Sequence, residues 1–106
     1  LVHERLADGG VAVFQTDSPT LRPEAIRGTL RNTTALFVES HAYWCTVPSF
    51  PEGICTFVVA TKEAGVRDAF DEKRYDCVAE SCRYYNREVH GGAFLLPKVV
   101  RETVLT

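Results

Sequence analysis

The sequence predicts an α/β fold in which helices cover a small sheet with at least one antiparallel strand. An unbroken apolar and β-branched run covers Ile54–Thr61, a mixed run covers about residues 38–47, and two prolines and a glycine lie between them at residues 48–53. Proline cannot donate to a sheet ladder and glycine accepts positive φ, so the middle segment is predicted to be a loop between antiparallel strands. A strand without polar alternation is typical of a position covered on both faces.

The elements before this hairpin are predicted from shorter signals. Residues 6–10 indicate the end of a helix and a turn, and the apolar residues 11–14 predict a short buried strand. Pro23 fits the first position of a helix, and Glu24 beside it suits the helix dipole. This helix is expected to end at residues 32–34, just before the hairpin.

Short helices are predicted after the hairpin. The polar residues 63–72 are expected to form a surface connection with one helical turn at residues 66–70. Apolar side chains at near-helical spacing predict a helix over residues 72–84, and residues 88–96 predict one or two helical turns that paired glycines weaken. Pro97 is expected to begin a final amphipathic helix.

Composition and charge limit the function classes. The chain has 106 residues, 45% hydrophobic and 25% charged, with a net charge of −2, which fits one small domain. Since it has no basic block, we expect neither a nucleic-acid partner nor a membrane partner. No apolar run approaches the roughly 20 residues that span a bilayer. Because the sequence begins at Leu1 and contains no methionine, we expect a processed product or part of a longer chain.

The cysteines at positions 45, 55, 77 and 82 raise the question of a disulfide or metal site. No pair has the two-residue spacing of a zinc knuckle or a thioredoxin-type site, and the histidines are far apart in the sequence. Cys45 and Cys55 lie in the two arms of the hairpin and could face each other. We predict buried, reduced thiols, and a free-standing thiol or metal module stays open as an alternative.

Two features are candidate ligand contacts. Gln15 directly follows the predicted strand 11–14, and α/β proteins commonly place ligand contacts at such strand ends. A solvated strand end is the alternative interpretation. The stiff loop 48–53 either holds its aromatic side chain over a ligand site or is a well-packed turn.

Three segments carry a resemblance to a known family. They are QTDSP at residues 15–19, CTVPSFPEG at 45–53 followed by FVVATK at 57–62, and RYYNREVHGGAFLLP at 83–97. In this order and spacing they resemble the C-terminal half of the catalytic domain of spermidine synthases, the polyamine aminopropyltransferases. The third segment is the most specific, and the likeness covers nearly the whole chain.

The resemblance implies a Rossmann-like fold of the class I methyltransferase type. Residues 1–106 would form a single partial domain, the C-terminal half of that α/β sheet, with three strands flanked by helices. The last strand, Ile54–Thr61, would lie antiparallel between the other two. This placement agrees with the two-sided burial expected from its apolar run.

The resemblance also implies a chemistry. Family members transfer an aminopropyl group from decarboxylated S-adenosylmethionine to putrescine, giving spermidine and methylthioadenosine. The donor is a co-substrate, so no cofactor is expected. A cytoplasmic enzyme is implied that binds a small polyamine and whose full-length form is a homo-oligomer, a dimer or larger. Residues 1–106 alone are expected to be inactive.

The resemblance assigns substrate-binding roles to two residues. By position, Gln15 matches the family's amine-binding glutamine, whose amide oxygen can accept a hydrogen bond from an ammonium group. Phe50 matches a tyrosine that lines the amine channel, so the aromatic wall remains here and the hydroxyl is missing. Tyr84, Tyr85 and His90 belong to the third segment, and they are assigned to packing of the C-terminal helices.

No catalytic residue is named in this chain. In family members the donor-binding loop and the proton-accepting aspartate lie upstream of the matched segments. Asp17 and Glu52 lie near the candidate site but are given no role. Phe50 and the glycines at 91–92 depart from the family pattern. They motivate an alternative function, a non-catalytic spermidine-synthase-like subunit or a regulatory or assembly protein.

Overall fold

The computed structural model describes residues 1–105. Within that range no helix is long and apolar enough to cross a membrane. The helices, strands and 3₁₀ turns follow in this order: α1 Val2–Arg5, β1 Val11–Gln15, α2 Pro23–Leu36, β2 Glu39–Thr46, β3 Ile54–Thr61, η1 Val66–Asp68, α3 Glu72–Val78, η2 Ala79–Ser81, α4 Arg87–Gly92 and α5 Lys98–Val104.

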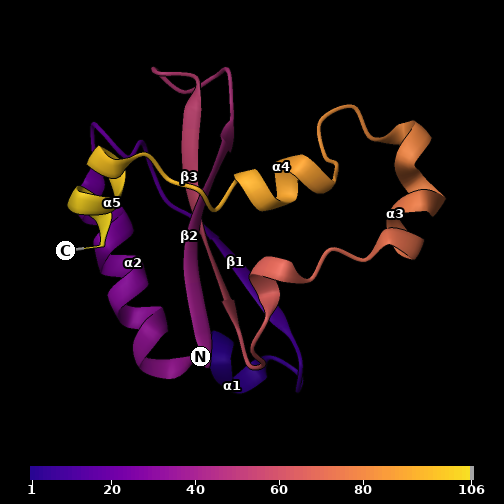
Figure 1. Ribbon diagram of the computed structural model, residues 1–106. Coiled ribbons are helices and arrows are strands. Elements are labelled where there is room, and N and C mark those ends of the chain that lie inside the picture. The colour runs from indigo at the N-terminus through magenta and orange to yellow at the C-terminus, as the bar shows by residue number, and fades with distance from the viewer. Residues whose placement is uncertain (106) are drawn as a thin grey trace.

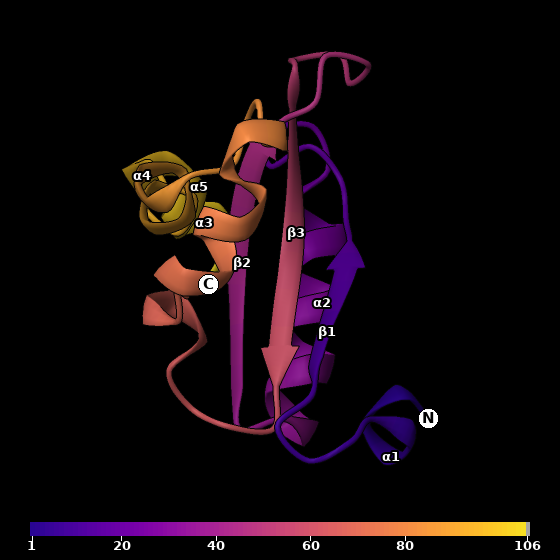
Figure 2. The ribbon, with the colours of Figure 1, turned by 90° about the vertical axis from the view of Figure 1, so that its right-hand side faces the viewer.

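The strands form a three-stranded sheet in the order β1-β3-β2. β3 is antiparallel to both neighbours, pairing Val11 with Thr61 on one side and Glu39 with Thr61 on the other. The last strand in sequence is therefore the middle strand in space, as predicted. β1 and β2 run in one direction and β3 returns between them, which Figure 2 shows from the side.

Two layers of helices enclose the sheet, with α2 and α5 on one face and α4 on the other (Figure 1). α2 begins with proline at its first helical position, where the missing N–H costs nothing. Its apolar side chains recur at helical spacing and meet the sheet. The core on this face consists of Ile26, Leu30, Ala42, Val58, Val100 and Val104.

The opposite face is covered by aromatic packing from α4. The ring of Phe94, just after α4, lies 6.0 Å from His41 and 5.6 Å from Tyr43, both on β2. α4 begins at Asn86, whose side-chain oxygen accepts the Val89 N–H at 2.8 Å and caps the helix. The cap explains why this helix forms in spite of its paired glycines.

The expectation that the strand beginning at Val11 is buried was wrong. Val11 is 53% exposed and Val13 is 54% exposed. The strand pairs only with β3, so within residues 1–105 it lies at an edge of the sheet. A short apolar run cannot distinguish a strand covered on both faces from one covered on a single face.

Two helix ends also differ from the predictions. α2 does not end at residues 32–34 but continues to Leu36, because the backbone ladder persists and the Phe37 N–H donates to the Thr33 carbonyl at 2.8 Å. The helix predicted over residues 72–84 stops at Val78 and tightens into η2. Val78 is exposed, so the apolar side chain that suggested a longer helix does not pack against a core.

Candidate functional site

The candidate site lies at one end of the sheet, here called the rim, where β1 and β2 end and β3 begins. The ladder continues past Gln15, since the Thr16 N–H donates to the Thr56 carbonyl at 3.1 Å. The Thr56 N–H in turn donates to the Asp17 carbonyl at 3.2 Å. These bonds place Gln15 at the same end of the sheet as the hairpin tip, residues 48–53, which stands above the strands in Figure 2.

Gln15 is exposed and lies beside an aromatic surface. It pairs in register with Phe57, which also pairs with Tyr43 on the other side. Directly paired residues of antiparallel strands share a face, so the three side chains project to the same side of the sheet. The rings of Tyr43 and Phe57 stack with centroids 5.5 Å apart. An amide that can accept from a cation therefore stands next to a stacked aromatic pair.

The hairpin tip is a compact turn that carries Phe50. The Phe50 N–H donates to the Val47 carbonyl at 3.0 Å, and the Gly53 N–H donates to the Phe50 carbonyl at 2.9 Å. Gly53 has a φ of 71°, a conformation that favours glycine. Phe50 is half-buried at this turn. The tip thus presents an aromatic ring at the rim on an internally bonded backbone.

The hairpin tip and the β1–α2 loop, residues 16–22, are linked by a carboxylate. The Ser18 hydroxyl donates to Glu52 Oε1 at 2.7 Å, and the Thr20 hydroxyl donates to the same oxygen. Hydrogen bonds from Thr20 and Ser18 lower the pKa of Glu52, because both stabilise its ionised form. Sequence reasoning placed Glu52 near the site but missed this link. The hydroxyls at positions 18 and 20 are the signal that could have suggested it.

The cysteines divide into different environments. Cys45 and Cys55 face each other across β2 and β3, and burial raises the pKa of both thiols. All four cysteines are free, but the prediction of buried thiols is right for Cys55 and wrong for Cys77, which is exposed on α3. Among residues 1–105 no group of three His, Cys, Asp or Glu side chains is arranged to hold a metal ion.

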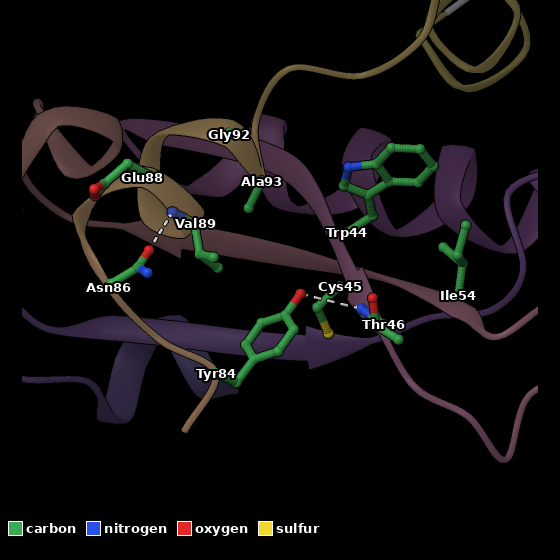
Figure 3. Close-up of a pocket in the computed structure, with 10 residues that line it drawn as sticks. All are labelled: Trp44, Cys45, Thr46, Ile54, Tyr84, Asn86, Glu88, Val89, Gly92 and Ala93. Atoms are coloured by element: carbon green, nitrogen blue, oxygen red, sulfur yellow. Dashed lines mark hydrogen bonds between the residues drawn. The ribbon is translucent and has the colours of Figure 1, made fainter. Parts of the chain in front are cut away.

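The third matched segment closes the outer edge of β2 (Figure 3). The Trp44 N–H donates to the Ala93 carbonyl at 3.1 Å, and the Thr46 N–H donates to the Tyr84 hydroxyl oxygen at 3.2 Å. A hollow of about 450 Å³ lies between this edge and α4. Tyr84 therefore satisfies a backbone donor that an edge strand would otherwise leave free, while its side chain stays half exposed.

Tyr85 and His90 form a second packing unit. His90 Nε2 lies 3.1 Å from the Arg67 carbonyl, which can only accept, so Nε2 carries the proton. His90 Nδ1 then accepts from the Tyr85 hydroxyl at 2.8 Å. These residues line a cavity of about 330 Å³ that also touches Val13, two residues before Gln15. The lining of this cavity, which lies beside the rim, is mostly apolar and aromatic, so it does not gather a cluster of reactive groups.

Comparison with known proteins places this geometry in context. Residues 1–73 match the family described as the spermine/spermidine synthase domain. Polyamine aminopropyltransferase 1 of Bacillus cereus is 28% identical over 103 residues, which cover 97% of this chain and 36% of that protein. Polyamine aminopropyltransferase 1 of Pseudomonas aeruginosa is 33% identical over 102 residues, covering 93% of this chain and 36% of that protein.

Solved structures show the same fold. The spermidine synthase of Thermotoga maritima has a TM-score of 0.84 at 24% identity, covering 93% of this chain and 35% of that chain. A spermidine synthase in complex with the transition-state analogue AdoDATO has a TM-score of 0.81 at 24% identity, covering 91% and 33%. The predicted α/β class with a Rossmann-like sheet is confirmed. The chain spans about a third of the length of the relatives that it matches.

Proposed function

Because this chain belongs to the spermine/spermidine synthase family, we propose that it forms the acceptor-amine side of an aminopropyltransferase. The observation that carries the proposal is the placement of Gln15 and the Phe50 tip at one rim of the sheet, joined by hydrogen bonds between their loops. Residues 1–106 would be a partial domain of the complete protein, in which the rest of the site lies on other segments.

The proposed reaction is an alkyl transfer from decarboxylated S-adenosylmethionine to putrescine. The sulfonium draws electrons from the adjacent propyl carbon, and an uncharged amine of putrescine attacks that carbon. The N–C bond forms as the C–S bond breaks, and the sulfur keeps the electron pair and leaves as methylthioadenosine. The nitrogen loses one proton overall, and spermidine results. The donor is a co-substrate, and we propose no cofactor.

Gln15 and Phe50 are the proposed contacts to the amine. The amide oxygen of Gln15 accepts a hydrogen bond from an ammonium group, and the Phe50 ring packs beside the methylenes of the diamine. One structural neighbour was solved with a transition-state analogue, which supports a small-molecule site in this family. No residue of this chain is assigned as the proton acceptor. We place the complete protein in the cytoplasm as a homodimer or larger homo-oligomer.

The test is to measure spermidine formation by the complete protein with decarboxylated S-adenosylmethionine and putrescine. Gln15→Ala is expected to raise the KM for putrescine by about tenfold, the value of one hydrogen bond to a charged group. Asn32→Ala is the matched control, since Asn32 is an exposed amide on α2 away from the rim. A complete protein that forms no spermidine, or a Gln15→Ala variant with unchanged KM, would contradict the proposal.

A second candidate function is a non-catalytic spermidine-synthase-like subunit or a regulatory or assembly protein. Phe50 favours it, because the hydroxyl expected at this position of the family is missing. The paired glycines at residues 91–92 favour it as well. Native mass spectrometry of the complete protein, alone and mixed with an active homologue, separates the two functions. A mixed complex without turnover by the protein alone supports this second function.

A further inference from the structure

The hydrogen bonds at the rim lead to one inference about Glu52, which rests on the proposed function. We infer that Glu52 is a positioning residue that sets how Phe50 stands relative to Gln15, and thereby sets affinity for the acceptor amine. Glu52 acts through these two residues and touches no reacting atom. Its role is to hold the hairpin tip and the β1–α2 loop in a fixed position relative to each other.

The hairpin tip is stiff within itself, so a single outside anchor can fix its position. Pro48 and Pro51 flank Phe50 and restrict its backbone, and the Val47 N–H closes the turn on the Gly53 carbonyl at 2.8 Å. A stiff turn at the end of a two-stranded arm can still tilt as a unit. An anchor on the neighbouring loop stops that tilt, and Glu52 provides one.

The anchor point on the other loop is itself rigid. Ser18 is 1% exposed, its oxygen accepts the Leu21 N–H at 3.2 Å, and its own N–H donates to Asp17 Oδ1 at 2.7 Å. With these bonds made, the Ser18 hydroxyl proton points to Glu52. The ionised carboxylate thus receives its hydrogen bond from a side chain that has little freedom to turn.

The two anchored segments carry the two proposed amine contacts. Gln15 is the residue before the β1–α2 loop, and Phe50 lies two residues before Glu52 in the hairpin tip. Losing the Glu52 link frees the tip to move away from Gln15 without disturbing either side chain directly. A small misplacement of a binding group lowers effective affinity steeply, because the geometry must be restored on every encounter.

The experiment compares Glu52 variants of the complete protein. Glu52→Ala is expected to raise the KM for putrescine by about tenfold and to change kcat and the donor KM by less than about twofold. Glu52→Gln keeps an oxygen that accepts from both hydroxyls, so its putrescine KM is expected within about threefold of wild type. Glu80→Ala, an exposed glutamate on η2, is the matched control and is expected to match wild type.

A second variant tests the link from the other loop. Thr20→Val keeps the side-chain shape and removes one donor to Glu52, so a putrescine KM between those of wild type and Glu52→Ala is expected. In the Glu52→Ala background it is expected to add less than about twofold, since its partner is already gone. An unchanged putrescine KM in Glu52→Ala, or equal rises in both substrate KM values, overturns this inference alone. A wild-type protein without aminopropyl transfer overturns the proposed function itself.

Discussion

At the scale of single residues, the site depends on what each side chain can accept or donate. Gln15 supplies an amide and Phe50 supplies an aromatic ring. Glu52 supplies a carboxylate that accepts hydrogen bonds from two hydroxyls. Hydrogen bonds from those hydroxyls lower the pKa of Glu52, so its carboxylate stays ionised to a lower pH than an ordinary glutamate does. The carboxylate of the hairpin tip therefore serves a structural role, which agrees with assigning the proton acceptor to none of these residues.

Replacing Phe50 tests the missing hydroxyl. Phe50→Tyr is expected to lower the KM for putrescine by about two- to tenfold, because the added hydroxyl supplies one hydrogen bond of roughly 0.5–1.5 kcal/mol. Steady-state kinetics of the complete protein measure this change. Phe50→Leu serves as the control, since it removes the aromatic wall and is expected to raise the same KM. A Tyr variant that binds putrescine more weakly than wild type would show that the ring position does not face the amine.

Glu39 gives a prediction on pH. Its pKa is lowered first by the hydrogen bond from His41 and then by the bond from the Gly65 N–H. A carboxylate whose folded pKa lies below its unfolded value of 4.5 stabilises the fold above that value and loses the effect as pH falls through the folded pKa. Glu39→Gln is therefore expected to unfold more easily than wild type near pH 7. Urea unfolding measured from pH 7 to pH 3 should show this difference shrinking.

At the scale of elements, the hairpin was the strongest sequence signal and the edge strand the weakest. The long apolar run at Ile54–Thr61 predicted a strand covered on both faces, and its place between the other two strands was implied by the resemblance. The apolar run that starts at Val11 is too short to predict which faces of its strand are covered. Gln15 and the aromatic loop 48–53 were candidate ligand contacts from the sequence, and their amine-binding roles came from the resemblance. The Glu52 link joins loops far apart in sequence, so only the folded chain brings its partners together.

α2 offers a test of helix energetics. A methyl group added at Gly28 meets no atom within 4 Å, and the residue lies inside the helix. Gly28→Ala is therefore expected to raise the free energy of unfolding by about 0.5–1 kcal/mol. Gly53→Ala is the contrasting control, because its φ of 71° disfavours a side chain and a loss of about 1–2 kcal/mol is expected. Chemical denaturation of both variants measures the two changes. Equal changes in the free energy of unfolding for the two variants would refute the different backbone conformations assigned to Gly28 and Gly53.

At the scale of the whole molecule, the sheet presents one covered edge and one open edge. The outer edge of β2 is covered because Trp44 and Thr46 donate to Ala93 and Tyr84, while β1 pairs on one side only within residues 1–105. The rim that we propose for the acceptor amine lies in this chain, whereas the donor contacts of the proposed reaction are assigned to other segments.

This division predicts the behaviour of the isolated piece. Residues 1–106, produced alone and supplied with decarboxylated S-adenosylmethionine and putrescine, are expected to form no spermidine. The complete protein under the same conditions is expected to form it. Mass spectrometry of the reaction mixture measures both. Turnover by residues 1–106 alone would mean that the donor and the proton acceptor are held by groups to which no such role is assigned here.

The central place of the last strand also fixes an order of assembly as the polypeptide leaves the ribosome. β1 emerges early but cannot join β2, because β3 separates them in the finished sheet. Val11 can pair only after Thr61 has been synthesised, and the Ser18–Glu52 hydrogen bond likewise forms only after the hairpin tip has been synthesised. Within residues 1–105, the rim proposed for the amine therefore forms only once β3 has paired with both of its neighbours.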